Sequence, residues 1–213
     1  MRHVYRDRLT AGVALADRLT RYAGRSDTVV LGLVRGGVPM AAVVAAHLRV
    51  PLDVLVVRKL GIPWAREVAF GALGPGGVQV LNDDIASRLD PGEIAEVTER
   101  ETVEQRRQEQ RYRADRKPLD LTGQVTILVD DGLATGATAR AAATVAYQLG
   151  ASRVVLAVPV GSIEACNGLS RLVDELVCPL RPRDFGAVSR YYRDFHQVTD
   201  EEVASELARR RLD

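Results

Sequence analysis

Cysteine and aromatic residues are scarce in this sequence. Cys166 and Cys178 are the two cysteines among 213 residues, and aromatic residues make up 5% of the chain. So few cysteines exclude a disulfide framework, and their spacing does not form a metal-binding pair. We expect both to be buried small apolar side chains in a reducing cytoplasm.

An excess of charge of either sign and long apolar runs are also missing. The 29 lysines and arginines nearly balance the 28 aspartates and glutamates, for a formal net charge of +1, so the composition gives no reason to expect a nucleic-acid partner. No apolar run approaches the ~20 residues of a membrane span, and the first residues, MRHVYRDRLT, lack the apolar core of a signal peptide. We therefore expect a cytoplasmic protein without a nucleic-acid or membrane partner.

Apolar runs and alanine-rich segments alternate along the chain, and hydrophobic residues make up 46% of it. Short β-branched runs predict buried strands at residues 28–34, 51–57, 125–129, 153–160 and 172–178. Helical patterns cover residues 5–22, 38–48, 137–149 and 200–210, and the apolar face expected in the first of these is Leu9, Val13, Leu15, Ala16 and Leu19. This order predicts a single α/β domain over residues 1–213, with a mostly parallel, doubly wound sheet flanked by helices.

The most informative stretch is residues 125–147, VTILVDDGLATGATARAAATVAY. Its pattern indicates a buried strand, a tight turn and a helix, an order that places the turn at the carboxyl edge of a parallel sheet, where open α/β proteins bind ligands. Residues 135–138 begin the helix, where unpaired N–H groups and the helix dipole favour an anion such as a phosphate monoester. Asp130 and Asp131 would repel a phosphate, so they need sugar hydroxyls, a divalent cation, or both as partners.

The run ILVDDGLATGATA resembles the signature of type I phosphoribosyltransferases, in which an apolar strand, two acidic residues and a few small residues precede Thr-Gly-x-Thr. The resemblance implies that the acid pair, Asp130 and Asp131, holds the ribose hydroxyls of phosphoribosyl pyrophosphate (PRPP). It also implies a Mg²⁺ cofactor, which the acid pair would hold mainly through those hydroxyls. The 5-phosphate would bind a phosphate loop made of Ala134, Thr135, Gly136, Ala137 and Thr138.

Three other interpretations of this stretch compete with the resemblance. An acidic nucleotide-triphosphatase motif would need a G-x-x-x-x-G-K-[ST] loop, which the chain lacks, and a dinucleotide-binding G-x-G-x-x-G turn is also absent. The third is a structural strand-turn-helix with solvated carboxylates. A motif in its expected structural context favours the phosphoribosyl interpretation over all three.

A second strand-turn-helix carries Arg35, Gly36 and Gly37, which we name the glycine loop. Consecutive glycines let backbone N–H groups converge on an anion, although a plain tight turn is the common explanation of such a pair. Alongside the PRPP motif, the glycine loop resembles the pyrophosphate loop of the family. Arg58 and Lys59 follow the strand at 51–57 and resemble the basic pair that opens a flexible lid in the adenine-type branch, so we expect them to be catalytic together with the acid pair.

A long excursion separates two parts of the predicted core, at about residues 24–59 and 118–179. The excursion, about 60–117, is expected to form a lid with a hairpin at 70–81, a short helix at 83–89 and a polar helix at 91–116. The apolar stripe expected on that helix is Ile94, Val97, Val103 and Tyr112. Trp64 is either lid packing or a platform for a base.

The tail, about residues 180–213, concentrates aromatic side chains and is expected to form a smaller hood. Phe185, Tyr191, Tyr192 and Phe195 are candidates for sandwiching a planar base, and a small hydrophobic cluster is the alternative. The tail resembles that of a predicted-phosphoribosyltransferase branch without an assigned substrate. Thr199 and Glu202 form a capping box for the last helix. Candidates for a general acid or base are Glu67, Asp184, Asp194 and His196.

The resemblance implies transfer of the 5-phosphoribosyl group from PRPP to a nitrogenous base with release of pyrophosphate. Hypoxanthine-guanine enzymes carry an acidic residue where this chain has Ala134, so a 6-oxopurine acceptor is not expected. The family commonly forms homodimers. Alternatives are a regulator that senses PRPP or a nucleotide without catalysis and, more remotely, a phosphatase or nucleotide-binding stress protein that shares the anion cup.

Overall fold

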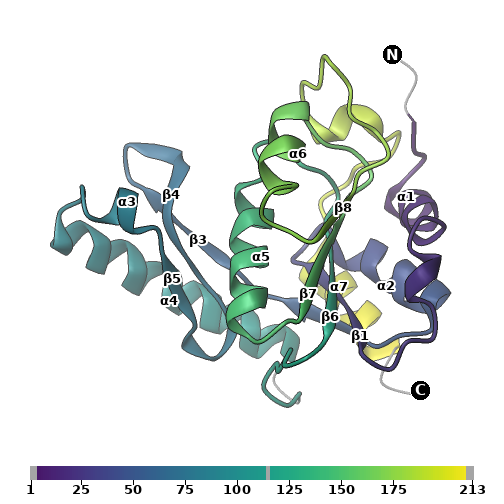
Figure 1. The fold of residues 1–213 in the computed structure, drawn as a ribbon, viewed down its shortest axis with the longest axis horizontal. Coiled ribbons are helices and arrows are strands. Elements are labelled where there is room, and N and C mark those ends of the chain that lie inside the picture. Colours follow the sequence, from purple (N-terminus) through teal and green to yellow (C-terminus); the bar gives the residue numbers. More distant parts are fainter. Residues whose placement is uncertain (1–3, 114–115, 210–213) are drawn as a thin grey trace.

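A five-stranded parallel sheet forms the centre of the protein (Figure 1), which a computed structural model describes over residues 4–113 and 116–209. The strand order is β2-β1-β6-β7-β8, and each neighbouring pair is parallel. The strands are β1 (Thr28–Leu33), β2 (Leu52–Leu55), β6 (Val125–Val129), β7 (Arg153–Ala157) and β8 (Glu175–Val177). The predicted α/β fold with a mostly parallel sheet is confirmed.

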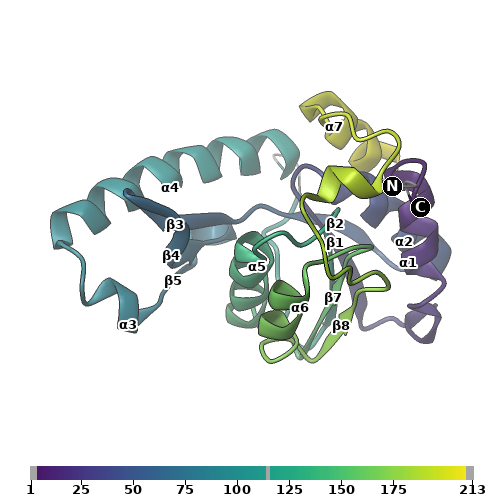
Figure 2. The same ribbon diagram turned by 90° about the horizontal axis from the view of Figure 1, so that it is seen from above.

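Helices cover both faces of this sheet (Figure 2). On one face lie α1 (Arg8–Ala16), α2 (Val38–Leu48) and α7 (Asp200–Arg209), and on the other α5 (Ala137–Gln148) and α6 (Ile163–Leu169). Successive strand side chains point to opposite faces, so Val30 packs in the first apolar cluster and Leu31 in the second. Strand β1 is therefore buried along its whole length.

The sheet has a topological switch point between β1 and β6. From β1 the chain crosses through α2 to β2 on one side, whereas from β6 it crosses through α5 to β7 on the other side. In open α/β sheets the crevice at such a point, outside the carboxyl ends of the strands, is where ligands bind. The glycine loop and the acid pair directly follow β1 and β6, so the fold brings both to this crevice.

A smaller antiparallel sheet projects to one side of the core (Figure 1). It consists of β3 (Arg58–Ile62), β4 (Ala65–Leu73) and β5 (Gln79–Leu81), and α3 (Asp83–Ala86) and α4 (Pro91–Arg113) follow it. The expected hairpin is confirmed. The basic pair Arg58 and Lys59 begins strand β3, in which Leu60 and Ile62 alternate inward and pack with Phe70 and Val97 in a separate apolar cluster.

Helix α4 forms as expected, but its buried stripe differs from the predicted one. Val97 and Tyr112 are buried, whereas Val103 is 65% exposed. The buried face passes instead through Gln105, which is 3% exposed and donates a hydrogen bond to Glu109 Oε2 at 3.0 Å. A polar residue on the buried face of a helix cannot be recognised from an apolar periodicity.

The first helix is shorter than expected, and of its predicted apolar face Leu15, Ala16 and Leu19 are buried whereas Leu9 and Val13 are not. Asp7 forms a capping box with Thr10, α1 ends at Ala16, and a 3₁₀ turn covers Thr20–Tyr22. Leu9 and Val13 are about half exposed; the buried side of the helix is Arg8, Ala11, Gly12, Leu15 and Ala16.

The tail after β8 is irregular, with one 3₁₀ turn at Val188–Tyr191. The predicted capping box of α7 is confirmed, because Glu202 Oε2 accepts a hydrogen bond from the Thr199 N–H at 2.7 Å and Thr199 Oγ1 accepts one from the Glu202 N–H at 3.2 Å. Among residues 4–113 and 116–209, no helix combines the length and the apolar composition needed to cross a membrane.

Both cysteines are buried free thiols, as expected. Although 12 positions separate them in the sequence, they meet around Gly161, where an added Cβ would lie 2.7 Å from Cys166 Sγ and 3.3 Å from Cys178 Sγ. The hydrogen bond from Cys178 lowers the pKa of Cys166 to about 7.

Candidate functional site

The glycine loop and the end of β6 pack directly against each other at the switch point. A Cβ added at Gly36 would overlap with Asp131 Oδ2, and one added at Gly37 would overlap with the Val129 carbonyl oxygen. Only residues without a side chain allow this approach. The peptide bond between Val34 and Arg35 is cis. Two segments about 90 positions apart in the sequence therefore form one continuous backbone surface.

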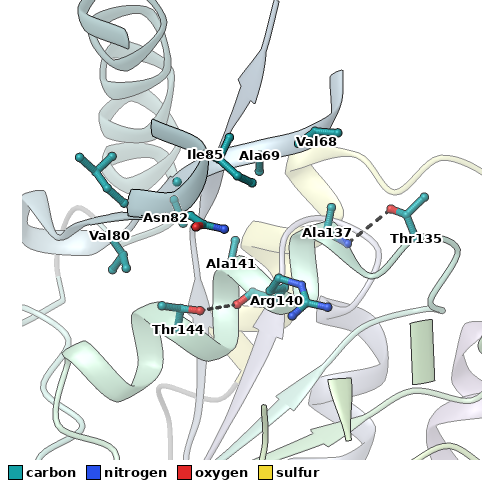
Figure 3. A pocket seen from close by; sticks show the side chains of 13 residues that line it. Val68, Ala69, Val80, Asn82, Ile85, Thr135, Ala137, Arg140, Ala141 and Thr144 are labelled. Atoms are coloured by element: carbon teal, nitrogen blue, oxygen red, sulfur yellow. Dashed lines mark hydrogen bonds between the residues drawn. The ribbon is translucent and has the colours of Figure 1, made fainter. Parts of the chain in front are cut away.

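The phosphate loop lies at the N-terminus of α5, with Ala134, Thr135 and Thr138 exposed. Gly136 is the N-cap residue with φ of 75°, so no cap side chain accepts hydrogen bonds from the first turn. The Ala137 N–H donates to Thr135 Oγ1 at 3.4 Å (Figure 3). Outward N–H groups and the helix dipole make this turn suitable for an anion.

Burial dominates the electrostatics of the acid pair. It raises the pKa of Asp130 well above its ordinary value of 3.8, and the charge of Asp131 raises it further. Burial also raises the pKa of Asp131, although the charge of Arg8 opposes this. The Asp131 N–H donates to Asp130 Oδ1 at 2.9 Å. These two carboxylates are costly to ionise, so a ligand that donates hydrogen bonds or carries positive charge would stabilise their ionised forms.

Arg8 belongs to this site, although the sequence patterns did not predict it. Its Nη2 and Nε donate to Asp131 Oδ2 at 2.9 and 3.1 Å, and its Nη1 donates to the His196 carbonyl oxygen at 2.7 Å. The residue is 7% exposed. A usable signal was present, because Arg8 shares the buried helix face of Ala11 and Leu15, where a charged side chain needs a partner.

A cavity of about 610 Å³ opens beside the glycine loop and the phosphate loop. Its walls come from the end of β1, from β3, from α4 and from the phosphate loop, through Val34, Arg58, Lys59, Arg100, Glu101 and Thr138 among others. Arg58 pairs with Glu101, with Nη2 and Oε2 2.7 Å apart. Arg35 is not among the residues that line this cavity, and its Nη1 lies 3.5 Å from Asp200 Oδ1. The cavity thus combines the cations of Arg58, Lys59 and Arg100 with the carboxylate of Glu101.

The model of the phosphoribosyl transferase domain family matches residues 6–196. The chain belongs to this family. Two curated Mycobacterium tuberculosis proteins named "Putative phosphoribosyl transferase", from strains CDC 1551 / Oshkosh and H37Rv, are 47% identical over 212 residues. That match covers 99% of this chain and 48% of theirs, so the chain spans about half the length of these relatives. The crystal structure of TT1426 from Thermus thermophilus has 43% identity and a TM-score of 0.90, and the match covers 99% of both chains.

The aromatic tail of this phosphoribosyl transferase domain is packed into the core. Tyr191 and Tyr192 are 7% and 2% exposed. Phe185 stacks on Tyr191 with ring centroids 5.6 Å apart, and the ring centroids of Phe195 and Tyr192 lie 4.9 Å apart. These rings contact protein, as in the expected alternative of a small hydrophobic cluster. Their use as a platform for a base stays a prediction, as does that of Trp64, which is 67% exposed.

The acid and base candidates lie in different places. Asp184 is exposed in the tail, and Asp194 and His196 pair with each other next to Arg8. Glu67 lies in β4, and its side chain is outside the described part of the structure. The fold therefore places the backbone of His196 beside Arg8, which contacts Asp131, while the side chains of Asp194 and His196 are exposed.

The imidazole of His196 is expected to titrate above its ordinary pKa of 6.5. The hydrogen bond with Asp194 raises this pKa most, followed by that with Glu202, and the two contacts measure 3.3 and 3.1 Å. Because the folded-state pKa is the higher one, the pairing stabilises the fold below about pH 6.5 and is lost as the pH rises through the folded-state pKa. An NMR titration checks this, with Asp194→Asn plus Glu202→Gln as the control that returns the pKa toward 6.5. A pKa at or below 6.5 in the unaltered protein would contradict it.

A second cavity, of about 440 Å³, lies between the antiparallel sheet and α5 (Figure 3). Ala69, Val80 and Ala141 contribute apolar walls, and Asn82 and Arg140 contribute polar groups. Thr135 and Ala137 of the phosphate loop also line it. The phosphate loop thus separates this cavity from the one beside the glycine loop.

Proposed function

We propose that this protein transfers the 5-phosphoribosyl group of PRPP to a nitrogenous base and releases pyrophosphate. One observation carries the proposal: the glycine loop, the acid pair and the phosphate loop meet at the β1–β6 switch point. An anion cup for a phosphate, carboxylates for a polyol and a cationic cavity for a second anion match the three parts of PRPP. The division into core, lid and tail belongs to the same proposal.

Each part of the site has a role in this reaction. The N–H groups and hydroxyls of residues 134–138 anchor the 5-phosphate. The acid pair accepts hydrogen bonds from the ribose hydroxyls and favours positive charge that develops on carbon 1. Residues 35–37 with Arg58 and Lys59 bind pyrophosphate and neutralise the charge that it gains as it leaves. Catalysis is then mainly positioning and electrostatic stabilisation.

The residues at the site fit Mg²⁺ as a cofactor that is bound together with the substrate. Mg²⁺ prefers one or two carboxylates plus substrate oxygens over an all-protein cage. Asp130 and Asp131 supply two carboxylates, while the described residues hold no cluster of three or more His, Cys, Asp or Glu side chains suited to a metal. When bound, Mg²⁺ would neutralise charge on pyrophosphate, and the acid pair would hold it mainly through the hydroxyls of PRPP.

The acceptor in this proposal is a base other than a 6-oxopurine. Position 134, directly before Thr135, is alanine, so the phosphate loop offers no carboxylate to the base. The Ala134 carbonyl oxygen accepts a hydrogen bond from Ser162 Oγ at 2.8 Å. A homodimer and a cytoplasmic location are further parts of the proposal, and the two free thiols support the location.

Calorimetric titration of PRPP with Mg²⁺ into the purified protein tests the proposal. We expect saturable binding at one site per chain, and pyrophosphate release when a panel of bases is added. Ribose 5-phosphate and pyrophosphate serve as partial ligands, each of which should bind more weakly than PRPP. Binding without release with any base would favour the PRPP-sensing alternative, and no binding of PRPP would overturn the proposal.

A further inference from the structure

Asp131 is held from two directions by residues outside the segment that contains it. At its side chain, Arg8 donates two hydrogen bonds to the single oxygen Oδ2, at 2.9 and 3.1 Å. At its backbone, the Tyr192 hydroxyl donates to the Asp131 carbonyl oxygen at 2.7 Å. Because both Arg8 donors converge on Oδ2, the orientation of the carboxylate is set while Arg8 leaves Oδ1 unengaged.

Arg8 is itself fixed in place. Its guanidinium carbon lies 3.9 Å from the centre of the Phe195 ring, a cation–π contact that is strengthened by burial. Its third contact is the hydrogen bond to the His196 carbonyl oxygen. The capping box of Asp7 and Thr10 fixes the start of the helix that carries it. A charged side chain with these partners has little freedom to leave Asp131.

Tyr192 is held equally firmly. It is 2% exposed, and its ring lies between Tyr5, with centroids 5.7 Å apart, and Phe195, at 4.9 Å. Backbone hydrogen bonds join the same segments, from the Tyr5 N–H to the Tyr191 carbonyl oxygen at 3.0 Å and from the Arg193 N–H to the Tyr5 carbonyl oxygen at 2.9 Å. The start of the chain and the tail thus form one support next to the acid pair.

We propose that Arg8, Tyr192 and Phe195 are positioning residues that present Asp131 to the ribose hydroxyls of PRPP. This inference rests on the function proposed above and gives part of the aromatic tail a different role. Tyr192 and Phe195 act on the ribose-binding carboxylate, so neither ring serves as the platform for the acceptor base. Tyr191 differs, because its hydroxyl donates to the carbonyl oxygens of Asp184 and Phe185, within the tail.

The two adjacent tyrosines provide a matched pair of variants. Each is buried and each donates to backbone carbonyl oxygens, but only Tyr192 donates to Asp131. Tyr192→Phe removes one hydroxyl and is expected to weaken PRPP binding by about 5- to 10-fold, as one hydrogen bond allows. Tyr191→Phe is expected to change it less than about 2-fold. Arg8→Lys keeps the charge, loses the two-donor contact, and is expected to weaken PRPP binding by about 10-fold or more.

Calorimetry with PRPP, ribose 5-phosphate and pyrophosphate distinguishes a positioning role from a general loosening of the site. Ribose 5-phosphate carries the hydroxyls, so Tyr192→Phe should weaken it by the same factor as PRPP. Pyrophosphate alone binds the glycine loop and the basic residues, so its affinity should stay unchanged. Thermal unfolding of each variant verifies that the protein compared is folded.

The outcomes distinguish this inference from the proposed function. Unchanged PRPP affinity in both Tyr192→Phe and Arg8→Lys, with the unaltered protein binding PRPP, overturns the positioning role alone. Equal weakening by Tyr191→Phe and Tyr192→Phe, or a parallel loss of pyrophosphate affinity, also overturns it, because general packing then explains the effect. Failure of the unaltered protein to bind PRPP overturns both.

Discussion

A chain carrying Asp130→Asn and Asp131→Asn together is expected to remain folded and to lose PRPP binding by about 100-fold or more. Each carboxylate would accept hydrogen bonds from ribose hydroxyls, and bonds to charged groups contribute about 1.5–3 kcal/mol each. Asparagine has nearly the same shape but lacks the charge and offers one acceptor oxygen instead of two. Calorimetric titration of PRPP with Mg²⁺ measures the loss.

The fold is expected to tolerate this change because keeping both carboxylates ionised costs free energy in the protein without ligand. Burial raises the pKa of both carboxyl groups, which means that the surroundings disfavour their charged forms. An asparagine in place of Asp131 retains an oxygen that can accept from Arg8, but the buried guanidinium loses its opposite charge, which offsets part of the stability gained at Asp130. A matched control is Asp27→Asn with Asp120→Asn, which changes the net charge equally at exposed positions away from the site. If the site double variant binds PRPP as tightly as this control, the acid pair does not hold the ribose.

Replacing Gly37 by alanine is expected to destabilise the protein by about 3 kcal/mol and to lower its melting temperature by about 6–12 °C. The new methyl group would overlap with the Val129 carbonyl oxygen and would lie 3.0 Å from the Leu33 backbone nitrogen. Both belong to the central strands β6 and β1, which are buried and paired with each other. Neither strand can withdraw without breaking the ladder.

Gly36→Ala is expected to act differently, although it is the neighbouring position. Its methyl group would overlap with Asp131 Oδ2, a side-chain atom that can move only by giving up its contacts with Arg8. We expect a smaller loss of stability than for Gly37→Ala, because a side chain rather than a central strand yields, and at least about a 10-fold loss of PRPP affinity, since the carboxylate leaves its position. The control for both glycine variants is Gly168→Ala, where the added Cβ meets only the flexible end of Arg140 at 3.1 Å. If Gly37→Ala unfolds at the same temperature as this control, the glycine loop and the end of β6 are not closely packed.

The central part of the site follows from local sequence patterns. The glycine loop and residues 130–138 each lie in a strand-turn-helix, and parallel strands place such turns along one edge. The position of the switch point between β1 and β6 could not be predicted from local sequence patterns, because the strand order depends on which way each crossover turns.

Residues that act on the site across long distances in the sequence were not predicted. The contact between Arg8 and Asp131 spans 123 positions, and that between Arg58 and Glu101 spans 43. Periodicity on an isolated helix placed Leu9 and Val13 on the buried face together with Leu15, Ala16 and Leu19, whereas Leu9 and Val13 are about half exposed and Arg8 is buried. A periodic apolar pattern does not reveal a buried charge that has a specific partner elsewhere in the chain.

The insertion of the antiparallel sheet and α4 between β2 and β6 has a consequence for protein synthesis. Strand β1 pairs with β2 on one side and with β6 on the other, and residues 34–124 separate β1 from β6. Because the ribosome releases the N-terminal part first, the edge of β1 that faces β6 stays unpaired while the whole insertion is made. An apolar strand with an open edge is a template for pairing with other chains. A strand that is fully buried in the finished protein is thus an aggregation-prone segment of the nascent one, until Val129 has left the ribosome.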